Sequence, residues 1–136
     1  MKRLILVFSV LILSLTTFSQ KVFHPFDAYL KKGTEWIKVE ETEKAVYPNI
    51  IIYFNGSDDG FSMIDRVEIE NGWNDTFIFP YKGVNTGNRT ITWKVFDKEG
   101  KSAYFSIGFY EDDANKKFSA IKISYNNVEY MYLCRY

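Results

Sequence analysis

The chain has 136 residues, and its 17 basic and 17 acidic residues leave a formal net charge of zero at neutral pH. This balance provides no basic field to attract a phosphate backbone or an anionic lipid surface, which argues against nucleic acid as a partner. Aromatic residues make up 18% of the chain. Large rings favour half-buried β-strands, so the composition indicates a β-rich domain.

The N-terminus has the three-part layout of a secretory signal peptide. The basic pair Lys2-Arg3 precedes an apolar stretch that ends at Leu15, and small residues follow up to Ser19. The apolar stretch is shorter than the roughly 20 residues that a membrane-spanning helix needs. We therefore expect cleavage near Ser19-Gln20.

Cleavage there divides the chain into a signal peptide, residues 1–19, and a single β domain, residues 20–136. Such a protein is predicted to be secreted or periplasmic, with no stable membrane insertion. The only cysteine, Cys134, has no partner for an intrachain disulfide, so core packing has to supply the stability. Cys134 itself is expected to be a small buried side chain, or else to form an intermolecular bridge.

The segment from Phe23 to Gly33 is the only part of the predicted domain that suits a helix. Pro25 lies near its start and Gly33 just after its end, which is the usual distribution of these residues around a helix. We expect a short N-terminal helical turn here. Since it precedes the first patterned strand, deletion of Gln20 to Phe23 is expected to cost little stability.

From Thr34 onward, alternation of apolar and polar residues predicts an all-β fold of about eight strands. Short turns rich in Gly, Asn and Asp connect them, so sequential strands are expected to pair as an antiparallel up-and-down meander. We favour a barrel, because closure removes both sheet edges, but a sandwich stays open as an alternative. The predicted strands are 34–41, 46–54, 61–70, 76–81, 90–97, 102–111, 117–125 and 128–135.

The last two predicted strands have the clearest alternation. Ile121 and Ile123 lead into Asn126-Asn127, and the same alternation continues through Tyr130, Tyr132 and Cys134. Asparagine tolerates the positive φ angles of a two-residue hairpin. These apolar side chains are therefore expected to share one face of a terminal hairpin.

One short motif resembles a known family. Gly33-Thr34-Glu35-Trp36 is similar to the Gly-x-Trp that opens the first barrel strand of lipocalins, the calycin group of β-barrels, and Arg135 resembles the arginine that packs over that tryptophan. The resemblance implies an up-and-down barrel with an internal cavity for a small apolar ligand. It also implies that Trp36 and Arg135 close the base of the barrel. The C-terminal helix of lipocalins has no counterpart here.

Two acidic residues, Asp58 and Asp59, belong to a segment that begins like a calcium-binding loop. A bidentate glutamate is required at the twelfth position of such a loop, but that position is Arg66. The EF-hand interpretation therefore fails. Whether Asp58 and Asp59 share a looser cation site stays open.

No catalytic residues, metal ligands or cofactor motif emerge from the sequence. Nucleophilic catalysis usually needs a base beside the nucleophile, and the only histidine is His24, next to Pro25. One histidine and one distant cysteine do not supply a zinc site. We therefore predict a protein that is not an enzyme and uses no cofactor.

Exposed aromatic residues are the best candidates for ligand contacts. Trp73 lies in a polar stretch between two predicted strands. Tyr53, Tyr81 and Tyr104 fall on strand faces opposite the apolar stripes. We assign these four residues as candidate ligand-binding residues.

Two functions fit these observations. The first is an exported, non-catalytic binding module that takes a small apolar ligand in a barrel cavity. The second is a cell-envelope or extracellular interaction domain that docks on a protein partner through an aromatic sheet face. A cavity of a few hundred Å³ favours the first, and a filled core with an aromatic patch favours the second.

Overall fold

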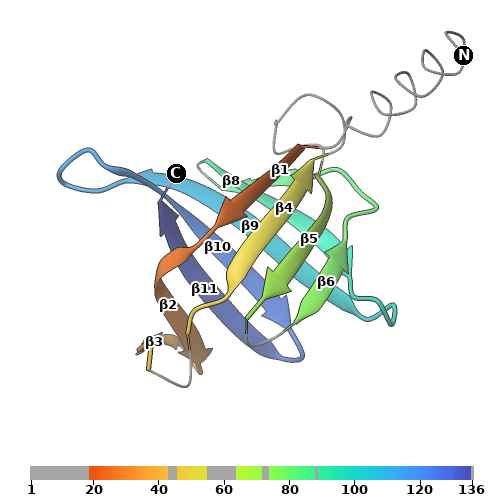
Figure 1. Ribbon diagram of the computed structural model, residues 1–136, viewed down its shortest axis with the longest axis horizontal. Coiled ribbons are helices and arrows are strands. Elements are labelled where there is room, and N and C mark those ends of the chain that lie inside the picture. Colours follow the sequence, from red (N-terminus) through yellow and green to blue (C-terminus); the bar gives the residue numbers. More distant parts are fainter. Residues whose placement is uncertain (1–18, 43–45, 55–63, 72–73, 88, 136) are drawn as a thin grey trace, which may run out of the picture.

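The computed structural model describes residues 19–42, 46–54, 64–71, 74–87 and 89–135, and these residues form one antiparallel sheet (Figure 1). The predicted signal peptide, apart from Ser19, lies outside the described residues. The strands are β1 (Ser19–Phe23), β2 (Pro25–Lys32), β3 (Glu35–Val39), β4 (Asn49–Phe54), β5 (Ile64–Glu70), β6 (Asp75–Ile78), β7 (Val84–Gly87), β8 (Thr90–Phe96), β9 (Ser102–Glu111), β10 (Lys117–Tyr125) and β11 (Val128–Arg135).

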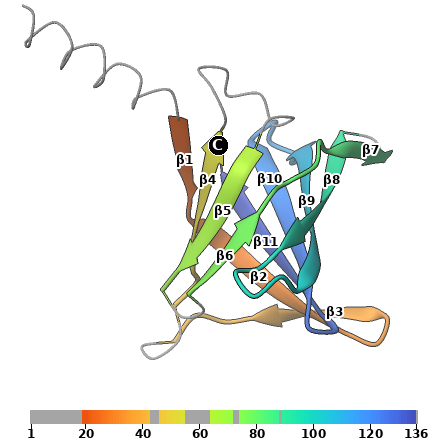
Figure 2. The ribbon, with the colours of Figure 1, turned by 90° about the vertical axis from the view of Figure 1, so that its right-hand side faces the viewer.

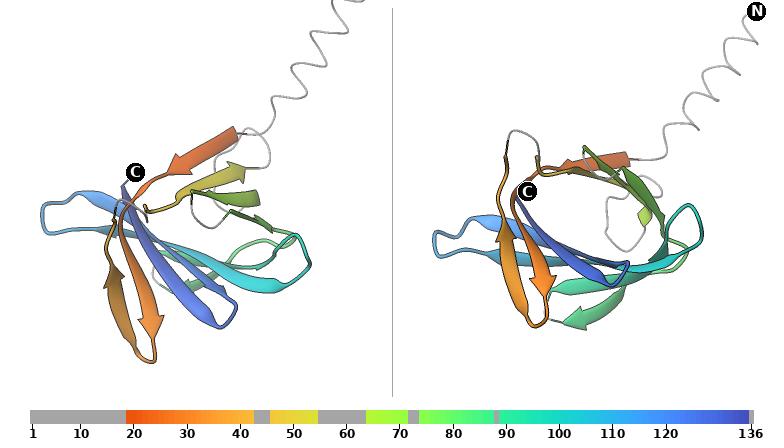
Figure 3. Two further views of the ribbon diagram at one scale, coloured as in Figure 1. Left: turned by 60° about the horizontal axis from the view of Figure 1, so that its bottom comes forward. Right: turned by 90° about the horizontal axis from the view of Figure 1, so that it is seen from below.

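The sheet is curled into a barrel-like shape (Figures 2 and 3). Strands β4, β5, β6, β8, β9, β10 and β11 follow one another as neighbours, which confirms the predicted antiparallel meander. The junction of β6 and β8 is narrow, since only Ile78 and Phe96 pair across it. β6 and β8 nevertheless belong to a single sheet. The sandwich alternative needs two separate sheets and does not apply.

A bent N-terminal strand joins the two ends of the curled sheet. β1 and β2 are separated only by His24; β1 pairs with β4, and β2 pairs with β11. Pro25 is the first residue of β2, a position where the missing backbone N–H is tolerated. The bend therefore lets one stretch of chain cover a sheet edge on each side.

β1 and β2 replace the predicted helical turn and, together with β7, raise the strand number from about eight to eleven. The turn residue Gly33, with φ of 62°, connects β2 to β3 instead of ending a helix. Phe23 is only 2% exposed and pairs with Ile50. Phe23 thus belongs to the core and the segment from Gln20 to Phe23 pairs with β4, so the reason for expecting a small effect of its deletion, that it precedes the first strand, is wrong.

The inner face of the sheet forms one hydrophobic core. The rings of Phe79, Trp93 and Phe105 meet edge to face or tilted, with Phe79 lying 5.8 Å from Trp93 and 5.2 Å from Phe105 between centroids. Such ring contacts add to the burial of apolar area. Other fully buried side chains are Phe54, Phe77, Ile50, Ile52, Val67, Ile69, Ile107, Ile121 and Ile123.

The C-terminal hairpin has the predicted register. Tyr132 pairs with Ile121 and Tyr130 with Ile123, while Asn126 and Asn127 form the turn with φ of 55° and 62°. The carboxylates of two other turns cap their own loops: Asp97 accepts from the backbone N–H of Lys101 and Asp112 from that of Lys116. Short polar turns therefore fix the pairing of β8 to β11 locally.

Candidate functional site: an apolar pocket at the base of the barrel

An apolar pocket of about 350 Å³ lies beside the inner face of β2, β3 and β11. β3 lies across the lower end of the barrel in Figure 2, and we call this end the base. The second wall comes from residues 46–48, which precede β4, and from Asn71, which follows β5. The lining consists of Ala28, Tyr29, Leu30, Val39, Val46, Tyr47, Pro48, Asn71, Tyr130 and Tyr132.

Strand register explains why these residues meet. Val39 pairs with Ala28, and Ala28 pairs with Tyr132, so these three form one row across β3, β2 and β11. Leu30 and Tyr130 pair in the adjacent row. Directly opposed residues point to the same face of a sheet, so the two rows make a continuous apolar wall.

The pocket is open because nothing in the described residues covers this wall completely. Val39 is 41% exposed and Val46 is 55% exposed, whereas Tyr47 and Tyr132 are each 7% exposed. Ala28 contributes only a methyl group between two larger side chains. Because Ala28 is small, the middle of the wall is left unfilled. Larger side chains fill the equivalent space elsewhere in the barrel.

Tyr47 makes the polar contacts that hold one wall of the pocket in place. The Tyr47 hydroxyl donates a hydrogen bond to the backbone carbonyl of Val39, and the Tyr47 backbone N–H donates to the Glu41 carboxylate at 3.3 Å. Both contacts hold the segment before β4 against β3. They also place a carboxylate next to a residue that lines the pocket.

The hydroxyls of Tyr47 and Tyr132 stay protonated at neutral pH, because their pKa values are raised. Burial raises the pKa of Tyr47, and the carboxylates of Asp27, Glu40 and Glu41 raise it further. Burial likewise raises the pKa of Tyr132 far above its usual value. The rings of Tyr130 and Tyr132 lie nearly parallel, 6.4 Å apart with an interplanar angle of 6°.

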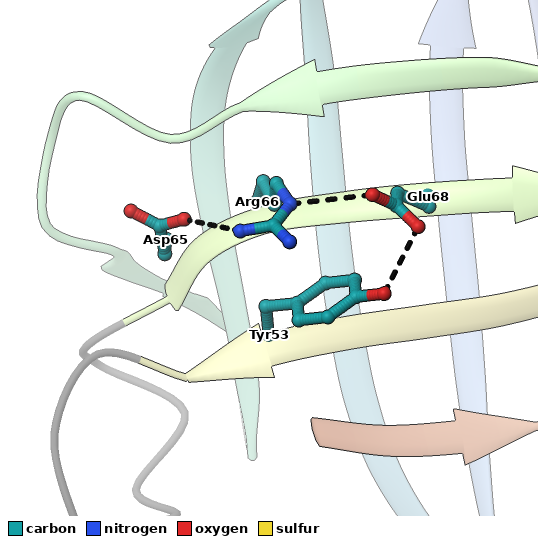
Figure 4. A network of polar contacts seen from close by, with 4 residues as sticks. All are labelled: Tyr53, Asp65, Arg66 and Glu68. Atoms are coloured by element: carbon teal, nitrogen blue, oxygen red, sulfur yellow. Dashed lines mark hydrogen bonds and ion pairs between the residues drawn. The ribbon is translucent and has the colours of Figure 1, made fainter. Parts of the chain in front are cut away.

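Of the four predicted ligand-binding residues, Tyr53 takes part in a polar network on the outer face of β4 and β5 (Figure 4). Its hydroxyl donates to Glu68 at 3.0 Å, and the guanidinium of Arg66 lies 3.8 Å from its ring centroid. Arg66 also contacts Asp65 at 3.1 Å and Glu68 at 3.3 Å. One face of the Tyr53 ring is therefore covered by Arg66.

Tyr81 and Tyr104 lie on the outer face around Phe96. Tyr81 is 60% exposed and meets the Phe96 ring edge to face at 6.4 Å. Tyr104 is 54% exposed and pairs with Lys94, whose ammonium group lies over the Phe96 ring. Ile78, which pairs with Phe96, is 44% exposed. We call Ile78, Tyr81, Phe96 and Tyr104 the outer aromatic patch.

Tyr53 connects to this patch by strand register. Tyr53 pairs with Arg66, Arg66 with Ile78, and Ile78 with Phe96, so these four side chains form one row across β4, β5, β6 and β8. The structure therefore brings three of the predicted residues, Tyr53, Tyr81 and Tyr104, to the same outer face. None of them lines the base pocket.

A second, polar hollow of about 830 Å³ lies where the turns after β2, β8 and β10 come together. Lys31, Lys101, Tyr104 and Glu129 line it, with the turn residues Asn126 and Asn127. Lys31 and Glu129 form an ion pair of 3.1 Å between partly exposed side chains. Solvated pairs of this kind stabilise little and hold the hollow open without giving it a clear ligand preference.

The fourth predicted residue, Trp73, and the cation candidates Asp58 and Asp59 lie outside the described residues. His24 is exposed and makes a hydrogen bond of 2.8 Å to Asn49. Within the described ranges, no group of three or more His, Cys, Asp or Glu side chains is arranged to hold a metal ion.

Trp36 and Arg135, which the lipocalin resemblance pairs, lie on different parts of the barrel. Trp36 pairs with Lys31 at the base, and the ammonium groups of Lys31 and Lys122 lie over its ring at 5.7 and 6.0 Å. Arg135 lies at the other end of β11, with its guanidinium 4.5 Å from the Phe26 ring. At about 3.3 Å per residue, β11 separates the two sites by roughly 20 Å.

Cys134 is completely buried, and burial raises the pKa of its thiol to about 12. A thiol of this kind is inert, because the reactive thiolate is not formed at neutral pH. The structure thus places Cys134 in the core, as the first of the two alternatives expects.

Sequence reasoning did not single out the residues of the base pocket. Val39, Val46 and Tyr47 come from the end of one predicted strand and the start of the next, and Tyr130 and Tyr132 were expected to be core residues. The signal that exists is the tyrosine pair on the apolar face of β11, because tyrosine in a core needs a partner for its hydroxyl. That signal does not identify the opposite wall.

Comparison with known proteins gives no relative. No family model, no curated protein and no solved structure matches the chain. Among the residues described, no helix has both the length and the hydropathy required to cross a membrane.

Proposed function

We propose that the protein is an exported, non-catalytic binding module that holds a small apolar ligand in the base pocket. One observation carries this proposal: a pocket of about 350 Å³ with an apolar lining lies beside the hydrophobic core of the described residues. Pockets for small molecules have volumes of roughly 300 to 1,000 Å³ and a mainly apolar lining with a few polar groups. The base pocket fits the lower end of this range.

Packing of the core supports the base rather than the centre of the barrel as the binding site. The inner side chains of β8, β9 and β10 include Trp93, Phe105 and Ile121, each at most 1% exposed. A ligand between them would have to displace close-packed side chains. At the base, Val39 and Val46 are already accessible, so binding there covers apolar surface without disturbing the core.

The expected ligand is compact. A molecule the size of one or two rings would cover the exposed parts of Val39 and Val46 and lie against the rings of Tyr130 and Tyr132. Burial of apolar surface contributes about 25 cal/mol per Å². Affinity is therefore expected in the micromolar range rather than the nanomolar range.

The test uses the uncharged fluorophore N-phenyl-1-naphthylamine, whose emission rises in apolar surroundings. The double variant Val39→Ser/Val46→Ser removes apolar wall from the pocket and should weaken binding about tenfold, since each buried methylene group is worth about 0.8 kcal/mol. The matched control is Val22→Ser/Val84→Ser, because Val22 and Val84 are 53% and 63% exposed but line no part of this pocket.

Three results decide this test. Weaker binding by the pocket variant alone supports the proposal. Equal binding by parent and pocket variant contradicts it, because the fluorophore then binds elsewhere. Absence of binding to the parent at millimolar protein also contradicts it. Thermal melts of both double variants establish that they are folded.

A second candidate function, docking of an extracellular or cell-envelope protein, is favoured by the outer aromatic patch. Exposed Ile78, Tyr81 and Tyr104 surround Phe96, and exposed aromatic clusters are typical of protein contact sites. A photo-crosslinking residue at position 81 or 104 should then give one product of defined mass in the protein's native compartment. The same residue at position 110, also an exposed tyrosine, is the control.

A further inference from the structure

We infer that the base pocket takes an organic cation, a ligand in which an alkylated ammonium group is attached to an apolar body. This inference rests on the proposed function, since it specifies the charge of the ligand in the same pocket. Three features of the described residues carry it: the aromatic lining, the carboxylates around Tyr47 and the lack of basic side chains in the lining.

Tyrosine rings provide the first feature. Tyr47, Tyr130 and Tyr132 line the pocket, and the last two present nearly parallel rings from the same face of β11. The face of an aromatic ring is negative, and it attracts a cation positioned within about 6 Å of the ring centroid. Alkylated ammonium ions are suited to such pockets because their methyl groups also bury apolar surface.

Nearby carboxylates provide the second feature. Glu41 accepts a hydrogen bond from the backbone N–H of Tyr47, which fixes its carboxylate beside the lining. Asp27 and Glu40 flank Lys38 on β3, with ion-pair distances of 3.2 and 4.0 Å. Two carboxylates therefore share one ammonium group on the sheet face opposite to Ala28 and Val39, and the Glu41 carboxylate lies beside Tyr47.

The net effect of these charges reaches the pocket wall. After burial, the carboxylates of Asp27, Glu40 and Glu41 are the main causes of the raised pKa of Tyr47, and Lys38 opposes them. The carboxylates raise this pKa because they make the electrostatic potential at the Tyr47 hydroxyl negative, which disfavours its deprotonation. The same negative potential stabilises a bound cation and repels an anion.

Composition of the lining provides the third feature. Among the described residues, those that line the base pocket include no Lys, Arg or His side chain. The polar hollow differs, because Lys31 and Lys101 both line it. The described lining therefore offers a carboxylate or phosphate group a cation in the polar hollow but not in the base pocket.

The inference is tested with a pair of probes that have the same shape. Benzyltrimethylammonium carries the charge, and neopentylbenzene replaces its nitrogen with carbon. The cation should bind about tenfold more tightly than the neutral isostere, as expected for a partly desolvated cation on tyrosine faces. Binding is measured from the tyrosine ring signals in NMR titrations.

Charge substitutions at Val46 locate the site. Val46→Lys should weaken binding of benzyltrimethylammonium about tenfold, and Val46→Glu should leave it equal or tighter, because a charge within about 6 Å of the ligand acts at an effective dielectric of about 20 to 80. Both substitutions remove the same part of the apolar wall, so they should weaken binding of neopentylbenzene to a similar extent, with less than about twofold between the Lys and Glu variants. Val22→Lys, on the outer face of β1, is the matched control and should have no effect on either probe.

The outcomes separate this inference from the proposed function. If both probes bind equally and Val46→Lys does not discriminate between them, the cation inference is wrong while the apolar pocket stands. If neither probe binds the parent, both proposals fail. If the cation binds more tightly but Val46→Lys has no effect, the cation site lies elsewhere and the inference is overturned.

Discussion

The centre of the barrel and its base pocket are built from the same kinds of residue but have opposite properties. In the centre, Phe79, Trp93 and Phe105 come from three separate segments and close on one another. At the base, Tyr130 and Tyr132 continue the same inner face of the sheet, but Val39 and Val46 beside them stay accessible. The comparison teaches that an apolar side chain on the inner face is buried only where another part of the sheet packs against it. Residue type alone does not decide its exposure.

The two regions also differ in how their tyrosines are used. Tyr125 packs edge to face on Phe77, with 5.3 Å between ring centroids, and its hydroxyl donates a hydrogen bond to the Asp97 carboxylate. It therefore packs as part of the core at the centre of the barrel. Tyr132 lies on the wall of the open pocket. If this contrast is correct, substitutions in the centre should affect stability, and substitutions at the base should affect binding.

The largest expected effect is that of Phe105→Ala. Phe105 is fully buried and contacts the rings of Phe79 and Trp93, so truncation leaves a cavity in the filled part of the barrel. We expect a loss of about 3 to 5 kcal/mol in the free energy of unfolding, measured by urea denaturation. A loss below about 1 kcal/mol would mean that the centre is loosely packed and that the contrast with the base does not hold.

An intermediate effect is expected from acid. The hydrogen bond from Tyr125, followed by those from the backbone N–H groups of Lys101 and Glu99, lowers the pKa of Asp97. A lowered carboxyl pKa stabilises the fold above the usual value of about 4, and this contribution is lost as the pH falls through the folded-state pKa. The stability difference between the parent and Asp97→Asn should therefore shrink steadily as the pH falls below about 4.

The control for that measurement is Asp113→Asn. Asp113 lies in the β9–β10 turn, next to the capping residue Asp112. The stability of Asp113→Asn is measured over the same pH range as that of Asp97→Asn, so that the effect of the Asp97 contacts can be compared with that of another turn carboxylate. A pH-independent difference for Asp97→Asn would contradict the role of the Tyr125 contact in closing the core.

The smallest effect on stability is expected from Val46→Ala. Val46 is 55% exposed, so truncation should change the free energy of unfolding by no more than about 0.5 kcal/mol. The same variant should still weaken binding of N-phenyl-1-naphthylamine, because it removes part of the pocket wall. If Val46→Ala instead caused a large loss of stability and no change in binding, the base would behave as the centre is expected to behave, and the contrast would be wrong.

Local patterns predicted much of the fold. β8, β9, β10 and β11 correspond closely to predicted strands, because alternating residues and turn-forming Asn and Asp act over short distances. The N-terminal strands were missed, because Pro25 and Gly33 have the same positions around a helix as around a bent strand and a tight turn. Their strand structure depends on pairing with β4 and β11, which no local pattern reports.

The candidate site was less predictable for the same reason. The outer-face position of Tyr104 follows from alternation within β9, whereas Tyr81 lies beyond the end of β6 at Ile78, although the strand predicted over 76–81 includes it. The base pocket instead requires β2, β3, β11 and residues 46–48 to come together. Which apolar residues stay uncovered is a property of that assembly, so Val39 and Val46 carry no mark in the sequence.

The bend at His24 has a consequence for the order in which the molecule is completed. Leu30 on β2 pairs with Tyr130 on β11. One of the first strands to be synthesised therefore cannot form all its hydrogen bonds until the last strand has been synthesised. Until β11 arrives, the free edge of β2 can accept other extended chains. Contacts so distant along the chain also form slowly. Pairing of β2 with β11 should therefore be the step most sensitive to chaperones and to protein concentration.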